Sequence, residues 1–224
     1  VIDSVGGFHG RAKDSQPVAG KICNAIDLSA TGTSDYVTLD ENILTNKTDF
    51  SVSLWAKTTK TSNQSLLSGA SSGSTNDLIM WFSSDTRFSP FLKSGNNGNI
   101  NSTSIADDIW HHLVWTRSGA QSCFYKDSVL QGCVTQATTA LNIASLLLGQ
   151  EQDSVGGGLD SSQAFNGLID ELLVFDGALP PTEITQIYTN QNLGLGYDGS
   201  DRSCSPLIHH YEISHDGQGL TCEA

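Results

Sequence analysis

In the stretch FSVSLW, residues 50–55, Phe50, Val52 and Leu54 alternate with Ser51, Ser53 and Trp55, and this pattern is typical of a β-strand. Phe50, Val52 and Leu54 fall on one face of an extended chain because successive side chains of a β-strand point to opposite faces. Apolar runs of strand length recur along the sequence, separated by clusters of Gly, Asn, Ser and Asp that are typical of exposed loops. The runs are LIMWF at 78–82, LVW at 113–115, SLLLG at 145–149 and GLIDELLVF at 167–175.

One helix is expected, over PPTEITQIYTNQ at 180–191, where the two prolines suit a helix start. Many short strands with a single terminal helix predict an all-β fold, in which two antiparallel sheets pack as a sandwich or jelly roll. We expect residues 1–192 to form this domain. Beyond this domain, LGLGYDGSDRSCSP at 193–206 is rich in Gly, Asp and Ser, and the residues that follow alternate again. Residues 193–224 are expected to form a linker or wrapping tail and the possible first strand of a following β-module, or else an extension packed on the sandwich.

The chain is strongly acidic, with 24 acidic against 11 basic residues and a formal net charge of -13. Such a surface repels phosphate backbones and anionic headgroups, so nucleic acid and membrane surfaces are poor partners. Clustered carboxylates instead suit a hard cation such as Ca²⁺. Solubility alone also accounts for an acidic surface.

Five cysteines are present, and none lies in a CxxC pair. Cys123 and Cys133 flank the plausible hairpin CFYKDSVLQGC, where a cross-strand disulfide fits. This pairing predicts an oxidising, extracytoplasmic compartment. Among the other three, we favour Cys23 with Cys204, which leaves Cys222 for a partner further along a longer secreted protein.

The loop from Gln150 to Gln163 concentrates the side chains that calcium prefers. Ca²⁺ takes roughly six to eight oxygen ligands from carboxylates, amides and backbone carbonyls. Three consecutive glycines, residues 156–158, allow the tight return that brings the two halves of the loop together. The predicted ligands are the side chains of Glu151, Asp153, Asp160 and Gln163 and the backbone carbonyl of Gln152.

Three blocks of the chain resemble the laminin-G-like and pentraxin families: DFSVSLWAKT, WHHLVWTR and the run from LLLGQEQDS to LPPTEI. The resemblance covers roughly residues 18–192 and implies the concanavalin-A-like jelly roll. The third block carries the pentraxin calcium loop at the same spacing. By resemblance, Glu151, Asp153, Asp160 and Gln163 hold one ion. Glu151, Asp153 and the Gln152 carbonyl share a second ion with a distant loop.

In pentraxins that distant loop supplies an Asp-Asn pair, and here the matching residues are 74–77. Asn76 falls on the Asn and Thr75 on the Asp, so Asp77 is the residue that could compensate. Trp81 falls where pentraxins place an apolar residue beside the ligand pocket, which makes it a ligand-binding candidate, with a core tryptophan as the alternative. The pair Asp170 and Glu171 recurs in laminin-G-like domains and implies either a further structural ion, with Asp3 or nearby carbonyls, or a polar strand edge.

A narrower resemblance joins DSVGGFHG near the start, KIC at 21–23 and the tail HHYEISHDGQGLTC. These segments resemble the laminin-G-bearing MshQ-type proteins associated with mannose-sensitive haemagglutinin (MSHA) pili of bacteria. The resemblance implies a pilus-associated module on the bacterial cell surface, joined to further domains of the same polypeptide and monomeric.

The same jelly roll hosts laminarinase-type glucanases, which need two catalytic carboxylates in the pattern ExDxxE. The nearest match here begins at Glu151 and has Gly156 where the proton donor belongs. We therefore expect a non-enzymatic, calcium-dependent adhesion module whose partner is a carbohydrate or another surface ligand. The alternatives are a protein–protein adhesion module in which calcium is purely structural and, less favoured, a glycosidase of the laminarinase type.

Overall fold

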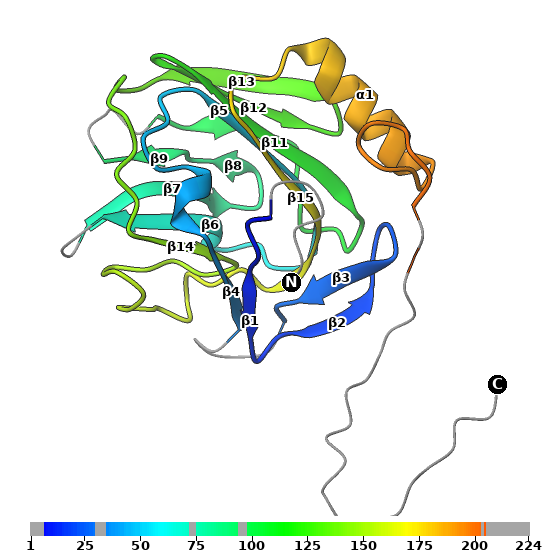
Figure 1. Ribbon diagram of the computed structural model, residues 1–224, viewed down its shortest axis with the longest axis horizontal. Coiled ribbons are helices and arrows are strands. Elements are labelled where there is room, and N and C mark those ends of the chain that lie inside the picture. Colours follow the sequence, from blue (N-terminus) through cyan, green and yellow to red (C-terminus); the bar gives the residue numbers. More distant parts are fainter. Residues whose placement is uncertain (1–6, 30–34, 72–74, 94–97, 203, 205–224) are drawn as a thin grey trace, which may run out of the picture.

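Two antiparallel β-sheets pack face to face in the computed structural model, and one helix lies outside them (Figure 1). The structure describes residues 7–29, 35–71, 75–93, 98–202 and 204. The expected all-β sandwich of two antiparallel sheets with one short C-terminal helix is confirmed. Residues 205–224, including Cys222 and the possible strand of a following module, lie outside the described residues.

The first sheet has eight strands among the described residues, and β9 pairs with β7 beside the main path. Its path runs through β1 (Arg11–Lys13), β4 (Tyr36–Leu39), β14 (Ser145–Leu148), β6 (Gln64–Ser71), β7 (Thr75–Ser84), β8 (Arg87–Phe88) and β10 (Ile100–Asn101), and β9 is Phe91–Leu92. The second sheet runs through β13 (Val129–Thr135), β12 (Gln121–Lys126), β11 (His111–Ser118), β5 (Phe50–Thr58), β15 (Gly167–Phe175), β3 (Asn24–Asp27) and β2 (Gln16–Ala19). A short 3-10 helix, η1, covers Glu41–Ile43.

The core lies between the two sheets and follows the alternation of β5. Phe50, Val52 and Leu54 are all fully buried in the main apolar cluster. Phe50 meets Trp115 of β11 edge to face, with ring centroids 5.1 Å apart. Such a core excludes water from both inner faces and holds the sheets as one rigid support for the loops.

Helix α1 (Pro181–Asn192) covers the outer face of the second sheet. Ile184 packs on Val114 of β11. Trp55 is buried on this outer face, where it stacks on Tyr188 at 5.7 Å. Its indole N–H donates to Gln191 Oε1 at 2.7 Å. The helix therefore covers a second, smaller cluster of buried side chains on the outer face of this sheet, and this cluster includes polar contacts.

Two disulfides are present among the described residues. Cys123 and Cys133 lie opposite each other in the β12–β13 hairpin, where the sequence pattern pairs them. Cys23 is bonded to Cys204, the second pairing that we favoured. Two disulfides are typical of an oxidising compartment.

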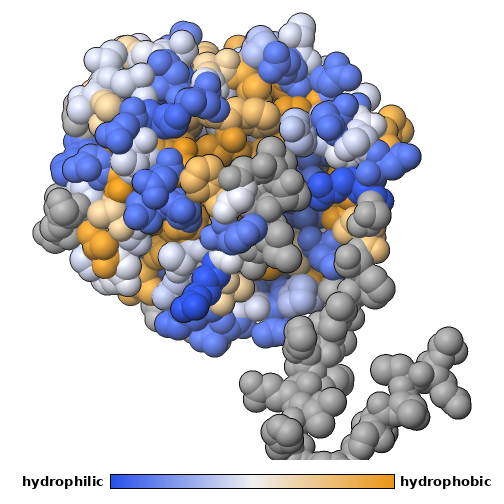
Figure 2. Space-filling view, viewed as in Figure 1, coloured by the Kyte–Doolittle hydropathy of each residue, from blue (hydrophilic) through white to orange (hydrophobic). Residues whose placement is uncertain are grey.

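The surface in Figure 2 mixes hydrophilic residues with smaller apolar areas. Among the described residues, no helix has the length and hydropathy needed to span a bilayer.

Candidate calcium site

The loop predicted to bind calcium connects β14 to β15 and is closed at its base. The Phe165 N–H donates to the Gly149 carbonyl at 2.9 Å, and the Gly149 N–H donates to Leu66 of β6 at 2.8 Å. Gly149 has φ +87°, a left-handed conformation that favours glycine. Further along, the Ser65 N–H donates to the Gln163 carbonyl at 2.9 Å. The loop is therefore docked on β6 at both ends.

Gln152 anchors the first half of the loop through its side chain, which is fully buried. Its Nε2 donates to the carbonyls of Ser68 at 3.0 Å and Ser145 at 3.2 Å. Its Oε1 accepts the Gly156 N–H at 2.9 Å. Because the amide is used in this way, only the Gln152 backbone carbonyl is left as a possible cation ligand, as the sequence predicts.

Glycine is required at Gly158 by close packing as well as by conformation. Gly158 has φ +67°, and a Cβ there would lie 2.8 Å from the Cβ of Asp153. Just before it, Ser154 and Gly157 exchange two backbone hydrogen bonds of 3.1 and 3.0 Å. This tight return sets the exposed Asp153 against the start of the second half.

Glu151 and Asn76 meet at the centre of the site, although 75 positions separate them in the chain. The Asn76 Nδ2 donates to Glu151 Oε1 at 2.5 Å. Glu151 is only 2% exposed. Its second carboxylate oxygen, Oε2, and the Asn76 amide oxygen are both buried without a hydrogen-bond partner. Two buried oxygens that lack partners lower the stability of the folded state unless a cation or a hydrogen-bond donor binds them.

The second half of the loop is held by a hydrogen bond within it and by a lysine from outside. Gln163 Nε2 donates to Asp160 Oδ2 at 3.1 Å. Lys60, in the turn between β5 and β6, donates from Nζ to the carbonyls of Ser162 at 2.8 Å and Ala164 at 2.7 Å. Sequence reasoning missed Lys60, because an isolated lysine in a turn carries no pattern that points to a distant loop.

Burial raises the pKa of Glu151 above its usual range, and the charges of Asp153 and Asp160 raise it further, against the hydrogen bond from Asn76. The pKa of Asp160 is lowered, mainly by the hydrogen bonds from Gln163 and Ser162. The charges of Asp153 and Asp160 are thus near enough to Glu151 to disfavour its ionised form. Within the described ranges, however, no three Asp, Glu, His or Cys side chains are gathered closely enough to hold a metal.

The donor set nevertheless fits calcium. The unpartnered oxygens of Glu151 and Asn76 are a carboxylate and an amide, the oxygen types that Ca²⁺ takes as ligands. The raised pKa of Glu151 is what a carboxylate shows when its charge is not compensated. Asp153 and Asp160 act on Glu151 through their charges, and Gln163 is hydrogen-bonded to Asp160.

Asp77 is the predicted ligand whose side chain is occupied elsewhere. Leu78 lies opposite Gly69 and Asn76 lies opposite Ala70, so Asp77 is the extra residue of a β-bulge in β7. Its Oδ2 accepts the Asn142 N–H at 2.6 Å, and its Oδ1 lies 3.8 Å from Lys93 Nζ. The expectation that Asp77 compensates for the missing Asp ligand therefore has no support from these contacts. Ser74 lies outside the described residues.

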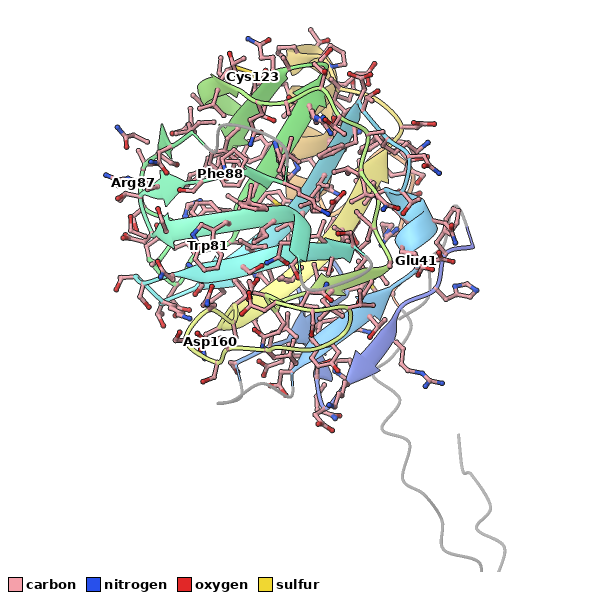
Figure 3. All side chains as sticks on the ribbon, turned by 90° about the vertical axis from the view of Figure 1, so that its left-hand side faces the viewer. Glu41, Trp81, Arg87, Phe88, Cys123 and Asp160 are labelled. Carbon is pink, nitrogen blue, oxygen red and sulfur yellow. A yellow bond between two sulfur atoms is a disulfide. The ribbon has the colours of Figure 1, made fainter. Side chains whose placement is uncertain are left out.

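Trp81 is not part of the core, which is the alternative that the sequence left open. On β7 the core side chains are those of Leu78, Met80 and Phe82, whereas Trp81 falls between them on the outer face and is half-buried. It pairs with Ser65 of β6, the strand on which the loop at 150–163 docks. In Figure 3 the loop that carries Asp160 lies below the strand that carries Trp81, on the same side of the molecule.

Asp170 and Glu171 form a separate buried acidic pair on β15. Asp170 Oδ2 accepts the Ile22 N–H at 2.9 Å, and burial raises the pKa of Asp170 to about 6. Glu171 Oε1 bonds to the guanidinium of Arg202 at 2.5 Å. Backbone N–H groups thus bind Asp170, and an arginine pairs with Glu171. Asp3, the other expected ligand, lies outside the described residues.

Two antiparallel sheets with an acidic loop docked on one of them form a jelly-roll architecture, and sequence comparison assigns its superfamily. The sequence profile of the concanavalin A-like lectin/glucanases superfamily, of the laminin-G type, matches residues 31–185. The chain belongs to this superfamily.

Two comparisons connect the chain with pentraxins. Human pentraxin-4 is 36% identical over 97 residues, which cover 41% of this chain and 20% of that protein. The native heptameric SAP-like pentraxin of Limulus polyphemus has a similar fold, with a TM-score of 0.60 and 21% identity, covering 78% of this chain and 82% of the other. The predicted laminin-G-like and pentraxin-like fold is confirmed.

A third comparison is with part of an enzyme. Domain 4 of AbnA, an extracellular arabinanase from Geobacillus stearothermophilus solved with arabinotriose, aligns with a TM-score of 0.57 and 22% identity, covering 82% of this chain and 90% of the other. This likeness shows the fold alone. The fold class thus includes ligand-binding modules and parts of enzymes, and the function has to be argued from the site.

Proposed function

We propose that this chain is a calcium-dependent ligand-binding module, and that its ligand is a carbohydrate. Glu151, Asp153, Asp160 and Gln163 hold one ion. Glu151, Asp153, the Gln152 carbonyl and Asn76 hold a second. Asp77 is left out of the ligand set because its carboxylate is already bound by Asn142 and Lys93.

The observation that carries the proposal is the pair of buried, unpartnered oxygens on Glu151 and Asn76. Leaving such atoms unsatisfied costs on the order of 1–3 kcal/mol each, and a charged group costs more. A divalent cation satisfies both oxygens at once and removes the repulsion from Asp153 and Asp160. The anchor at Gln152 holds the first half of the loop beside this point.

A sugar suits this site because bound calcium can accept a ligand hydroxyl as one of its oxygen ligands. Trp81, half-buried on the outer face of the same sheet, offers an apolar surface on which a sugar ring can stack. The binding function, rather than hydrolysis, is supported by Gly156, which stands where a glucanase of this fold needs its proton donor.

The module is proposed to act outside the cell, as part of an adhesin on the bacterial surface associated with MSHA-type pili. The two disulfides support an extracytoplasmic location. Residues 1–192 are proposed as the binding domain, and residues 193–224 as a linker or wrapping tail with the possible first strand of a following β-module. The domain works as a monomer.

A glycan array run in millimolar calcium and again in chelator tests the function. We expect glycan binding that disappears in chelator and is lost in Trp81→Ala, whose melting temperature should stay close to that of the wild type. Glycan binding that persists in chelator contradicts the proposal. Calcium binding without any glycan binding favours the second candidate, a protein–protein module with structural calcium.

A further inference from the structure

The disulfide between Cys23 and Cys204 joins two segments that lie almost at opposite ends of the described chain. Cys23 lies between β2 and β3, and Cys204 follows α1 by twelve positions. Their Cα atoms are 5.0 Å apart, although the sequence separation is 181. Figure 1 shows the segment after α1 turning back from the helix on the side of the molecule where β2 and β3 lie.

Non-covalent contacts reinforce this junction on both sides. Arg202, two residues before Cys204, pairs with the buried Glu171 at 2.5 Å. Lys21, two residues before Cys23, donates to Asn192 Oδ1 at the end of α1 at 2.7 Å. The residue between, Ile22, donates its N–H to Asp170. Three segments therefore meet at one place: the β2–β3 turn, the part of β15 around Asp170 and Glu171, and the segment after α1.

We propose that the Cys23–Cys204 disulfide is a mechanical clasp that carries tension past the domain. A pull applied to the chain before Cys23 and after Cys204 passes along the covalent bonds of the disulfide. Residues 24–203 then lie in a closed loop that cannot lengthen while the bond is intact, because its two ends are held 5.0 Å apart. Both sheets, apart from β1 and β2, and the whole loop at 150–163 belong to this protected part.

The strands outside the clasp yield first. β1 precedes Cys23 and pairs with β4 over only three residues, and β2 pairs with β3 over four. Tension strips these two edge strands and stops at Cys23. The proposal does not depend on calcium or on a sugar ligand, since it follows from the connectivity of the chain alone.

The other disulfide provides a matched control. Cys123 and Cys133 are separated by ten positions within the β12–β13 hairpin. They lie inside the closed loop, so their removal leaves the clasp unchanged.

Single-molecule force spectroscopy on residues 1–224, with handles at the two ends and Cys222→Ser to prevent exchange, tests the clasp. At about 3.3–3.6 Å per extended residue, release of the closed loop lengthens the chain by roughly 60–65 nm, whereas stripping the 22 residues before Cys23 gives roughly 8 nm. We expect only short events in the oxidised protein and in Cys123→Ser/Cys133→Ser. The long event should appear in Cys23→Ser/Cys204→Ser and in the wild type after reductant is added.

A long event in the oxidised protein overturns the proposal, and so does its absence from a folded Cys23→Ser/Cys204→Ser protein. If that variant does not fold, as judged by circular dichroism, the wild type before and after reduction decides the question. Peptide mapping of the non-reduced protein identifies which cysteines are joined, and a partner other than Cys204 for Cys23 also contradicts the assignment.

Discussion

Replacing Glu151 with glutamine should change stability in opposite directions with and without calcium. The substitution keeps the shape of the side chain and the acceptor for Asn76, but it removes the buried charge. Because the folded-state pKa of Glu151 is raised, the calcium-free wild type is favoured below the unfolded-state pKa and loses stability as pH rises through the folded-state pKa. Glutamine has no proton to lose, so Glu151→Gln should be at least as stable as the wild type at pH 7 in chelator.

In calcium, the wild type should instead be more stable than Glu151→Gln. At a calcium concentration 100 times the Kd, binding stabilises the folded wild type by about 2.7 kcal/mol. Glu151 belongs to both proposed ion sites, and we take its loss to raise the Kd about 100-fold, so that the same concentration stabilises the variant by only about 0.4 kcal/mol. The difference of about 2.3 kcal/mol corresponds to a shift in Tm of roughly 5–9 °C for a domain of this size.

Differential scanning calorimetry at pH 7, in chelator and in millimolar calcium, measures both effects. Glu183→Gln is the control, because it removes the same charge from an exposed position on α1. It should leave the calcium-induced shift in Tm intact. An equal calcium-induced shift in Glu151→Gln and in the wild type would show that Glu151 is not a ligand.

Two further substitutions test how the loop is held, and a third tests the titration of Asp170 on β15. Gln152→Leu removes the anchor of the first half and leaves several buried groups unpaired, so the free energy of unfolding in chelator should fall by about 2–3 kcal/mol in urea titrations; no change would refute the anchor. Gly158→Ala forces a left-handed residue against Asp153 and should weaken calcium binding in a titration, although no ligand is lost; unchanged affinity would contradict this. Burial raises the pKa of Asp170 from 3.8 to about 6, so its contribution to stability is lost as pH rises from the first value through the second. Asp170→Asn should flatten the dependence of stability on pH between about 4 and 6, and an unchanged slope would count against it.

The fold could be predicted because alternation in β5 and the helical pattern at 180–191 express burial directly. The side chains of Phe50, Val52 and Leu54 all lie in the core. The loop at 150–163 could be proposed as a calcium site from sequence because its carboxylates and glycines lie within one short stretch, and calcium binding there stays a prediction. Local patterns of this kind depend on few contacts with the rest of the chain.

The other parts of the site depend on register and on contacts between distant segments. The bulge in β7 determines that Asn76 meets Glu151 while Asp77 binds Asn142, and a one-residue shift cannot be read from the sequence. Trp81 is half-buried on the outer face because of the same strand pairing. Lys60 reaches the loop across more than 100 positions of sequence, through backbone carbonyls that leave no trace in residue type.

Calorimetric titration of the wild-type chain with calcium, beside the double variant Glu151→Ala/Asp153→Ala, tests the central claim most directly. We expect saturable uptake of calcium at or below millimolar concentration by the wild type and no measurable uptake by the variant. Circular dichroism of the variant confirms that its fold is retained. A wild-type protein that takes up no calcium at millimolar concentration, or a folded variant that takes up as much as the wild type, would contradict the assignment of this loop as a calcium site.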